Sequence, residues 1–264
     1  MEDSKLKKRQ KIKEKIFSLL SIAGFLACWW LITDVFQLAN TSLFPSPVTV
    51  FETFVDKLTN ANPDGNILGV HILNSLLVVG IGYFAGTLLG IPFGIALGWY
   101  KKFEMTVRPL FDIIRTIPPI AWIPIFILWL GIGLIAKSAI VFLTVFIAAA
   151  LNAYTGITSI NPVHMWAGQT MGASNWQLLW KIGIPTAVPM ICTGLKIGFN
   201  TAWTSLVGAE LLGATEGLGY MIQMARVYCR ADLVIVGMLT IGVIGLVLSI
   251  ILDYLEIILT KGRY

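Results

Sequence analysis

The sequence predicts an all-α membrane protein with about six transmembrane helices. Of its 264 residues, 56% are hydrophobic and only 12% are charged, whereas a soluble domain carries about 25% charged residues. Apolar runs of about 20 residues recur along the chain, and a run of that length can cross a bilayer as a helix. The length suits one membrane domain and leaves no room for a second, soluble domain.

The apolar runs predict spans over residues 16–36, 68–99, 109–133, 138–158, 186–212 and 232–258. Pro118 and Pro119 are expected to break the span 109–133. Just before this break, the spacing of Asp112 and Arg115 allows the two side chains to pair. The first span is too long for the core of a signal peptide and lacks a clear small-residue cleavage site, so we expect it to be retained. Before it, residues 1–15 hold seven basic side chains. Such a run can bind nucleic acid, but beside a span it is more simply a topology signal. We interpret 1–15 as a basic cytoplasmic leader or elbow and 16–264 as a single transmembrane domain surrounded by lipid, without nucleic-acid binding.

The placement of Lys and Arg predicts the orientation of the chain. With the N-terminus inside, fifteen of the 19 basic residues fall on the inner face and four on the outer face. Positive charges are retained on the cytoplasmic side of a membrane. We therefore expect a multi-pass protein of the cell's inner (plasma) membrane, with both termini and the loop 159–185 in the cytoplasm.

No pattern in the sequence supports catalysis by this chain. The phosphate-binding motif G-x-x-x-x-G-K-[ST] is absent, so ATP hydrolysis by that route needs another protein. The cysteines Cys28, Cys192 and Cys229 are scattered, and His71 and His164 are far apart, so neither type forms a metal-spaced motif. A membrane-embedded enzyme would need His, Cys or carboxylates clustered at depth. We predict no catalytic site, no metal site and no cofactor bound by this chain.

Glycines form the clearest periodicity, in the span 68–99. They recur at every fourth residue, which places them on one helix face and lets another backbone approach closely. This packing face, within the chain or between two chains, consists of Gly82, Gly86, Gly90, Gly94 and Gly98.

Polar side chains recur along one face of the span 186–212. Polar groups inside a span usually face a bundle interior or water. The stripe therefore indicates either the wall of a translocation path or a hydrogen-bonded seam between helices. Lys196 falls on the same face but near the inner end, where it can snorkel. The candidate path residues are Thr193, Asn200, Thr204 and Glu210.

Two shorter segments have shapes of their own. On the outer side, Ser46 is a candidate N-cap and Pro47 a candidate first residue of an amphipathic interfacial helix. On the inner side, the loop 159–185 reads as a short helix, a turn at Gly172, a second short helix and a stop at Pro185. A structured cytoplasmic loop indicates a docking surface.

The spacing in this loop resembles a known signature. Gly172 is followed by nine residues, Ile182, one residue, Ile184 and Pro185. This resembles the permease signature of bacterial ATP-binding-cassette (ABC) importers, E-A-A-x3-G-x9-I-x-L-P. The residues at 166–168 are Trp-Ala-Gly instead of Glu-Ala-Ala, so only Ala167 matches there.

Three further segments resemble one branch of that family, the permeases of taurine, alkanesulfonate, nitrate and bicarbonate importers. They are residues 43–47 (LFPSP), 115–124 (RTIPPIAWIP) and 209–221 (AELLGATEGLGYM). The resemblance runs from about residue 20 to residue 260. It implies the type I ABC importer permease fold and a path for a small polar, anionic solute. A permease for a vitamin precursor is the alternative, and an autonomous channel or ion-coupled carrier is a remote one.

The resemblance also implies partners. They are a second permease chain, forming a homodimer, two ATPase subunits that bind ATP and Mg, and an external substrate-binding protein. The loop would dock on an ATPase subunit as a coupling helix. Its implied coupling residues are Met165, Trp166, Ala167, Gln169, Gly172, Ala173, Ile182 and Pro185.

Overall fold

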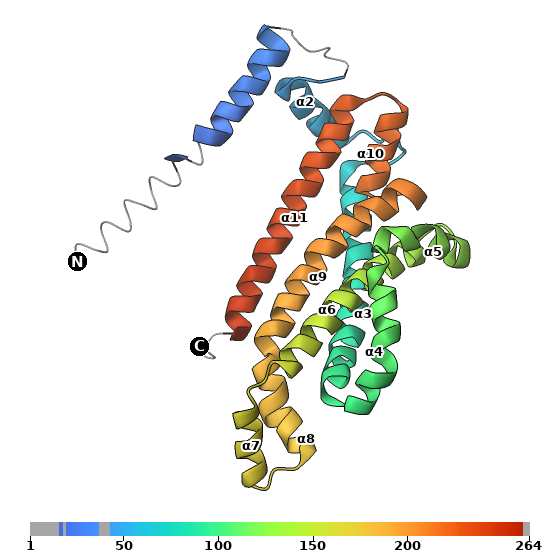
Figure 1. Ribbon diagram of the computed structural model, residues 1–264. Helices are drawn as coiled ribbons and strands as arrows, with labels where there is room; N and C mark the ends of the chain where they lie inside the picture. The colour runs from blue at the N-terminus through green and yellow to red at the C-terminus, as the bar shows by residue number, and fades with distance from the viewer. Residues whose placement is uncertain (1–15, 18–19, 37–42, 261–264) are drawn as a thin grey trace, which may run out of the picture. The chain divides into compact units, whose positions relative to one another are not determined.

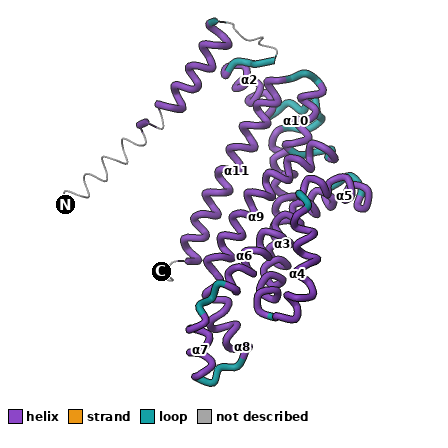
Figure 2. The backbone as a smooth tube through the Cα atoms, in the orientation of Figure 1, coloured by secondary structure: helices purple, strands orange, loops and turns teal. Residues whose placement is uncertain are grey.

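The computed structural model describes residues 16–17, 20–36 and 43–260, so the leader 1–15 lies outside the described residues. The described chain is built from helices (Figures 1 and 2). Four of its helical runs are long and apolar enough to cross a membrane: α3 (Leu68–Trp99), α6 (Leu134–Thr158), Asn175–Gly213, and α11 from Ala231 to Ile258. A shorter apolar helix covers Leu20–Val35, and its last part is the π-helical segment η1 (Leu31–Val35).

A broken helix supplies the remaining predicted span. α4 (Lys101–Thr116) is followed by η2 (Pro119–Trp122) and α5 (Ile123–Leu130), with a bend of 89° between the two parts. The residue before a proline is disfavoured in the helical conformation, and Ile117, before Pro118, is extended with ψ 119°. The break predicted at Pro118–Pro119 is therefore confirmed. In chain order, the described helices fall at the positions of the six predicted spans, but only four of them, or five with the bent pair, are long and apolar enough to cross a membrane, since the helix Leu20–Val35 is shorter.

The chain divides into two compact units. The first comprises residues 1–68 and 222–238 and contains α2 (Pro47–Lys57). Ser46 caps α2 by accepting a hydrogen bond from the backbone N–H of Thr49 at 3.2 Å, with Pro47 at the first helical position, as predicted. Lys57 forms a buried ion pair with Asp64. This pair ties the end of α2 to the turn that follows it.

The second unit comprises residues 69–221 and 239–264. Its centre is the contact between α6 and α9 (Ile184–Gly213), which lie side by side (Figure 1). Glycines bring the two backbones together: a Cβ added at Gly194 would lie 2.5 Å from Cβ of Asn152, and one at Gly156 would lie 3.0 Å from Cβ of Ala187. Close approach at small residues is the usual basis of helix packing in lipid.

The glycine face of α3 meets α6 of the same chain. A Cβ added at Gly82 would lie 2.6 Å from the Val141 side chain, and one at Gly94 would lie 2.2 Å from the carbonyl oxygen of Ala150. The remaining three glycines, Gly86, Gly90 and Gly98, meet α6 in the same way. Of the two uses that the sequence leaves open, this geometry corresponds to packing within the chain.

Candidate functional site

The loop between α6 and α9 is a helical hairpin whose turn depends on one glycine. α7 (Pro162–Thr170) is followed by Met171 as its C-cap and then by Gly172, which has φ +79°. The N–H of Gly172 donates to the carbonyl of Gln169 at 2.9 Å, and that of Ala173 donates to the carbonyl of Gly168 at 3.1 Å. This pair of hydrogen bonds is the Schellman motif, which favours glycine at its left-handed position. The predicted turn at Gly172 is thus present.

A capping box starts the second helix of the hairpin, α8 (Asn175–Leu178). The Ser174 hydroxyl accepts from the backbone N–H of Gln177 at 3.4 Å. In return, the Gln177 side chain accepts from the backbone N–H of Ser174 at 2.9 Å. The pattern S-x-x-Q is the sequence signal of this cap, and it fixes the direction in which α8 leaves the turn.

The two helices of the hairpin pack through Gly168. A Cβ added there would lie 2.5 Å from Cδ2 of Leu178 and 2.9 Å from Cδ1 of Ile182. Leu178 is buried, and Ile182 is only partly exposed. Ile182, one of the predicted coupling residues, therefore packs against α7 inside the hairpin.

Pro185 does not stop the helix as predicted, although it lies in the first turn of α9, where a proline is tolerated. α8, the π-helical segment η3 (Leu179–Gly183) and α9 form one apolar helical run of 39 residues, Asn175–Gly213. The N–H of Ile184 reaches back five residues to the carbonyl of Leu179. This wide turn gives room for the ring of Pro185, which lacks an N–H and would otherwise clash with the carbonyl four residues earlier. The hairpin is therefore continuous with the membrane span.

The outer surface of α7 is exposed. Trp166 is 62% exposed, and Ala167, Gln169 and Gly172 are also exposed. A large exposed indole on α7 suits a protein contact, because aromatic residues are enriched in interfaces. The remaining predicted coupling residues, Met165, Ala173 and Pro185, are partly buried.

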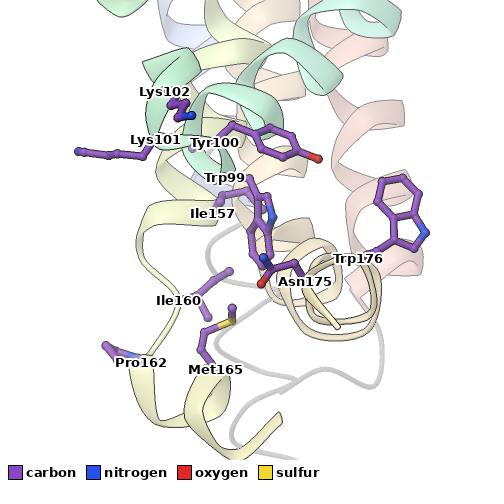
Figure 3. A pocket seen from close by; sticks show the side chains of 11 residues that line it. Trp99, Tyr100, Lys101, Lys102, Ile157, Ile160, Pro162, Met165, Asn175 and Trp176 are labelled. Atoms are coloured by element: carbon purple, nitrogen blue, oxygen red, sulfur yellow. The ribbon is translucent and has the colours of Figure 1, made fainter. Parts of the chain in front are cut away.

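A cavity of about 780 Å³ lies at the base of the hairpin. Met165 of α7 and Asn175 and Trp176 of α8 line it on one side, and Trp99 and Tyr100 line it on the other (Figure 3). The hairpin thus meets the end of α3 and the start of α4 across an open space.

A second cavity, of about 500 Å³, lies against α9. Asn200 and Thr204, two predicted path residues, are exposed on α9 and line it. Thr193 is partly buried and does not belong to the lining. The remaining lining residues are Arg115, Pro119, Thr144, Ile147, Ala148, Ile197, Thr201 and Ser205.

Glu210 does not lie on the path face, contrary to the sequence prediction. It follows Thr204 by six residues, which turns its side chain by about 240° around the helix axis. The carboxylate is buried, with 1% of the residue exposed. It accepts hydrogen bonds from the Ser75 hydroxyl and from the backbone N–H of Gly219, each at 2.8 Å. Glu210 therefore connects α9 to α3 and to the loop that follows α9.

The ion pairs of Lys196 and the position of Arg115 in the cavity lining were not predicted from the sequence. Lys196 Nζ lies 2.7 Å from Oδ1 of Asp253 and 2.8 Å from Oε2 of Glu256 on α11. Spacing within one span cannot reveal a partner about 60 residues away. Arg115, predicted to pair with Asp112, does so at 2.6 Å, but it also lines the cavity. Its position just before the Pro118–Pro119 break was the available signal, since broken helices at membrane depth line cavities.

The comparisons with known proteins agree with this geometry. The family described as "Binding-protein-dependent transport system inner membrane component" matches residues 86–262. The taurine transport system permease protein TauC of Escherichia coli (strain K12) is 35% identical over 260 residues, covering 97% of this chain and 93% of its own. The nitrate import permease protein NrtB of Synechocystis sp. is 30% identical, covering 90% of this chain and 86% of its own.

Solved structures show the same fold. One from the inward-facing conformations of the MetNI methionine ABC transporter has a TM-score of 0.63 and 22% identity, and covers 75% of this chain and 96% of its own. The helical architecture of the described residues and the sequence matches agree with one another. The chain belongs to the binding-protein-dependent inner membrane component family, and is a membrane-spanning permease of the ABC importer type with the type I fold.

Proposed function

We propose that this chain forms the translocation path for a small oxyanion, first of all a sulfonate such as taurine. The relatives support this choice, because they include the taurine permease and a putative aliphatic sulfonates transport permease of Bacillus subtilis (strain 168) that is 31% identical and spans 93% of this chain and 87% of its own. Two identical copies would assemble with two ATPase subunits, which bind ATP and Mg, and an external binding protein would deliver the solute.

The continuous helix Asn175–Gly213 is the observation that carries the proposal. At about 1.5 Å per residue its 39 residues extend about 58 Å, well beyond the roughly 30 Å hydrocarbon core. One end carries the capped turn of the docking hairpin, the middle carries Asn200 and Thr204, and the far end carries Glu210. A single stiff element thus joins the hairpin to the cavity and to the outer loop.

This helix suggests how the work of the ATPase subunits reaches the path. The α7 surface around Trp166 docks on an ATPase subunit on the cytoplasmic side. When the two ATPase subunits close on ATP, they move the two hairpins, and each hairpin moves the helix with which it is continuous. The two arrangements of the path are a two-state element whose balance the ATPase shifts.

A second candidate substrate is a vitamin precursor. A formylaminopyrimidine transport permease of Halalkalibacterium halodurans is 33% identical and covers 67% of this chain and 69% of its own. The absence of acidic side chains from the described lining of the 500 Å³ cavity, which includes Arg115, favours the anion.

Uptake by the reconstituted transporter tests the proposal. Proteoliposomes containing this permease and its ATPase, supplied with the matching binding protein, should accumulate taurine, another sulfonate or nitrate only when ATP is inside with the ATPase. A hydrolysis-deficient ATPase is the matched control and should abolish uptake. Uptake of formylaminopyrimidine but no small oxyanion would refute the substrate class, and uptake without ATP would refute the coupling.

A further inference from the structure

The lining of the 500 Å³ cavity in the second unit carries a positive charge. Its described lining contains one basic side chain, Arg115, and no acidic one. Around it stand an amide and four hydroxyl groups, from Asn200, Thr144, Thr201, Thr204 and Ser205. We propose that this cavity is an anion-binding station of the permease itself, in which Arg115 and Asn200 hold the oxyanion group of the solute. The identity of that solute rests on the proposed function.

Arg115 has hydrogen-bonding capacity to spare. Its Nε lies 2.6 Å from Oδ1 of Asp112, and its side chain is 38% exposed. Among the described residues, its two terminal amino groups have no acceptor. A guanidinium group presents these donors as a fork that matches two oxygens of a sulfonate, nitrate or bicarbonate.

Asp112 is shared by two arginines, although it lies closer to Arg115. Nε of Arg108 lies 3.6 Å from Oδ2 of Asp112, and NH1 of Arg108 lies 2.8 Å from Glu104. Glu104 also pairs with Lys101 at 2.9 Å. The row along α4 therefore contains three basic and two acidic groups and ends at Arg115. The row as a whole carries one net positive charge, and of its five charged groups only Arg115 belongs to the cavity lining.

Two of the three lining hydroxyl groups of α9 already donate to backbone carbonyl groups of the same helix. Thr204 donates its proton to the carbonyl of Asn200 at 3.0 Å, and Thr201 donates to that of Ile197 at 2.8 Å. The Asn200 side chain has no hydrogen-bond partner among the described residues. Arg115 on α4 and Asn200 on α9 thus converge on the cavity with free N–H groups. One half-exposed arginine implies weak, transient binding, which suits a site on a path.

Charged thiol reagents test the station without depending on transport. Thr204→Cys is introduced into the reconstituted transporter after the native cysteines are replaced, and its reaction is timed with a sulfonate-bearing and a trimethylammonium-bearing methanethiosulfonate. Normalised to a free thiol, the anionic reagent should react about tenfold faster, because positive charge in a cleft concentrates anions. Arg115→Gln should abolish this preference, whereas Arg115→Lys should retain it.

Lys102→Gln is the matched control, because it removes the same charge from an exposed position of the same helix, outside the cavity lining and outside the ion pairs described above. It should leave the anionic preference within about twofold. An equal preference in Arg115→Gln and in the parent would overturn the station, even if ATP-driven uptake of sulfonate continues. Loss of the preference in Arg115→Gln supports the station, even if the transported solute is not a sulfonate.

Discussion

At the scale of single residues, two left-handed positions show why glycine stands in the docking hairpin. Gly172 has φ +79° and Cys229 has φ +54°, and both lie at the same position of a Schellman motif. For an L residue this conformation costs about 1–2 kcal/mol. The chain tolerates this strain at Cys229, after α10 (Leu218–Val227). At the hairpin turn it has a glycine, which adopts the left-handed conformation without this cost.

Replacing Gly172 with Val should therefore uncouple transport. No atom lies within 4 Å of a Cβ added at Gly172, so the penalty comes from the backbone alone. A β-branched residue should shift the turn out of its left-handed conformation at a local cost of about 2 kcal/mol. We expect normal amounts of permease in the membrane with solute uptake reduced at least about tenfold. Thr170→Val, at an exposed position of α7, is the control, and equal uptake in both variants would contradict the role of the turn.

At the scale of elements, the contact between α3 and α6 depends on missing side chains. Gly94→Ala would place a Cβ 2.2 Å from the carbonyl oxygen of Ala150, and backbone cannot move aside cheaply. Overpacking of this kind costs about 1–3 kcal/mol. The variant should have a clearly lower unfolding temperature in detergent.

Gly80→Ala is the matched control for this prediction, because it lies on the same helix with no atom within 4 Å of the added Cβ. Alanine is the better helix former by about 1 kcal/mol, so this variant should be no less stable than the parent. If both alanines lower the unfolding temperature equally, the contact with α6 is not the reason for the glycines.

Features of these helices that depend on nearby residues could be predicted from the sequence, whereas contacts between helices could not. Hydropathy and period locate the spans, the break at Pro118 and the glycine face, because those features depend on local chemistry. Whether the helix continues through Pro185 depends on a wide π-helical turn in the preceding residues, and no residue type specifies such a turn. The partners of Glu210 and Lys196 come from other helices, so a stripe on one helix identifies a face without identifying its neighbour.

At the scale of the whole molecule, the predicted orientation rests on the bias of fifteen basic residues to four. Thr59→Cys, on the exposed end of the outer segment, should react with an impermeant thiol reagent added to intact cells. Lys101→Cys, whose parent side chain is 78% exposed, should react only after permeabilisation. The native cysteines are replaced first, since Cys28 and Cys229 are exposed. The opposite labelling pattern would reverse the topology.

The continuity of hairpin and span gives the molecule one central property: force applied at α7 reaches the cavity through a single helix. Under the proposed function, that force comes from a separate ATPase, and this chain has no G-x-x-x-x-G-K-[ST] motif of its own. The exposed surface around Trp166 is where we expect the two proteins to meet.

The most direct test of this central claim is ATP hydrolysis and solute uptake by the reconstituted transporter carrying Trp166→Ala. The indole is 62% exposed, so its loss should weaken docking without unfolding the permease. Trp129→Ala, at a tryptophan of α5 that is 71% exposed, is the control. We predict that Trp166→Ala lowers both uptake and hydrolysis stimulated by the loaded binding protein at least about tenfold, as expected for an interface hot spot, whereas Trp129→Ala retains both. Full stimulation and uptake in Trp166→Ala would contradict the account.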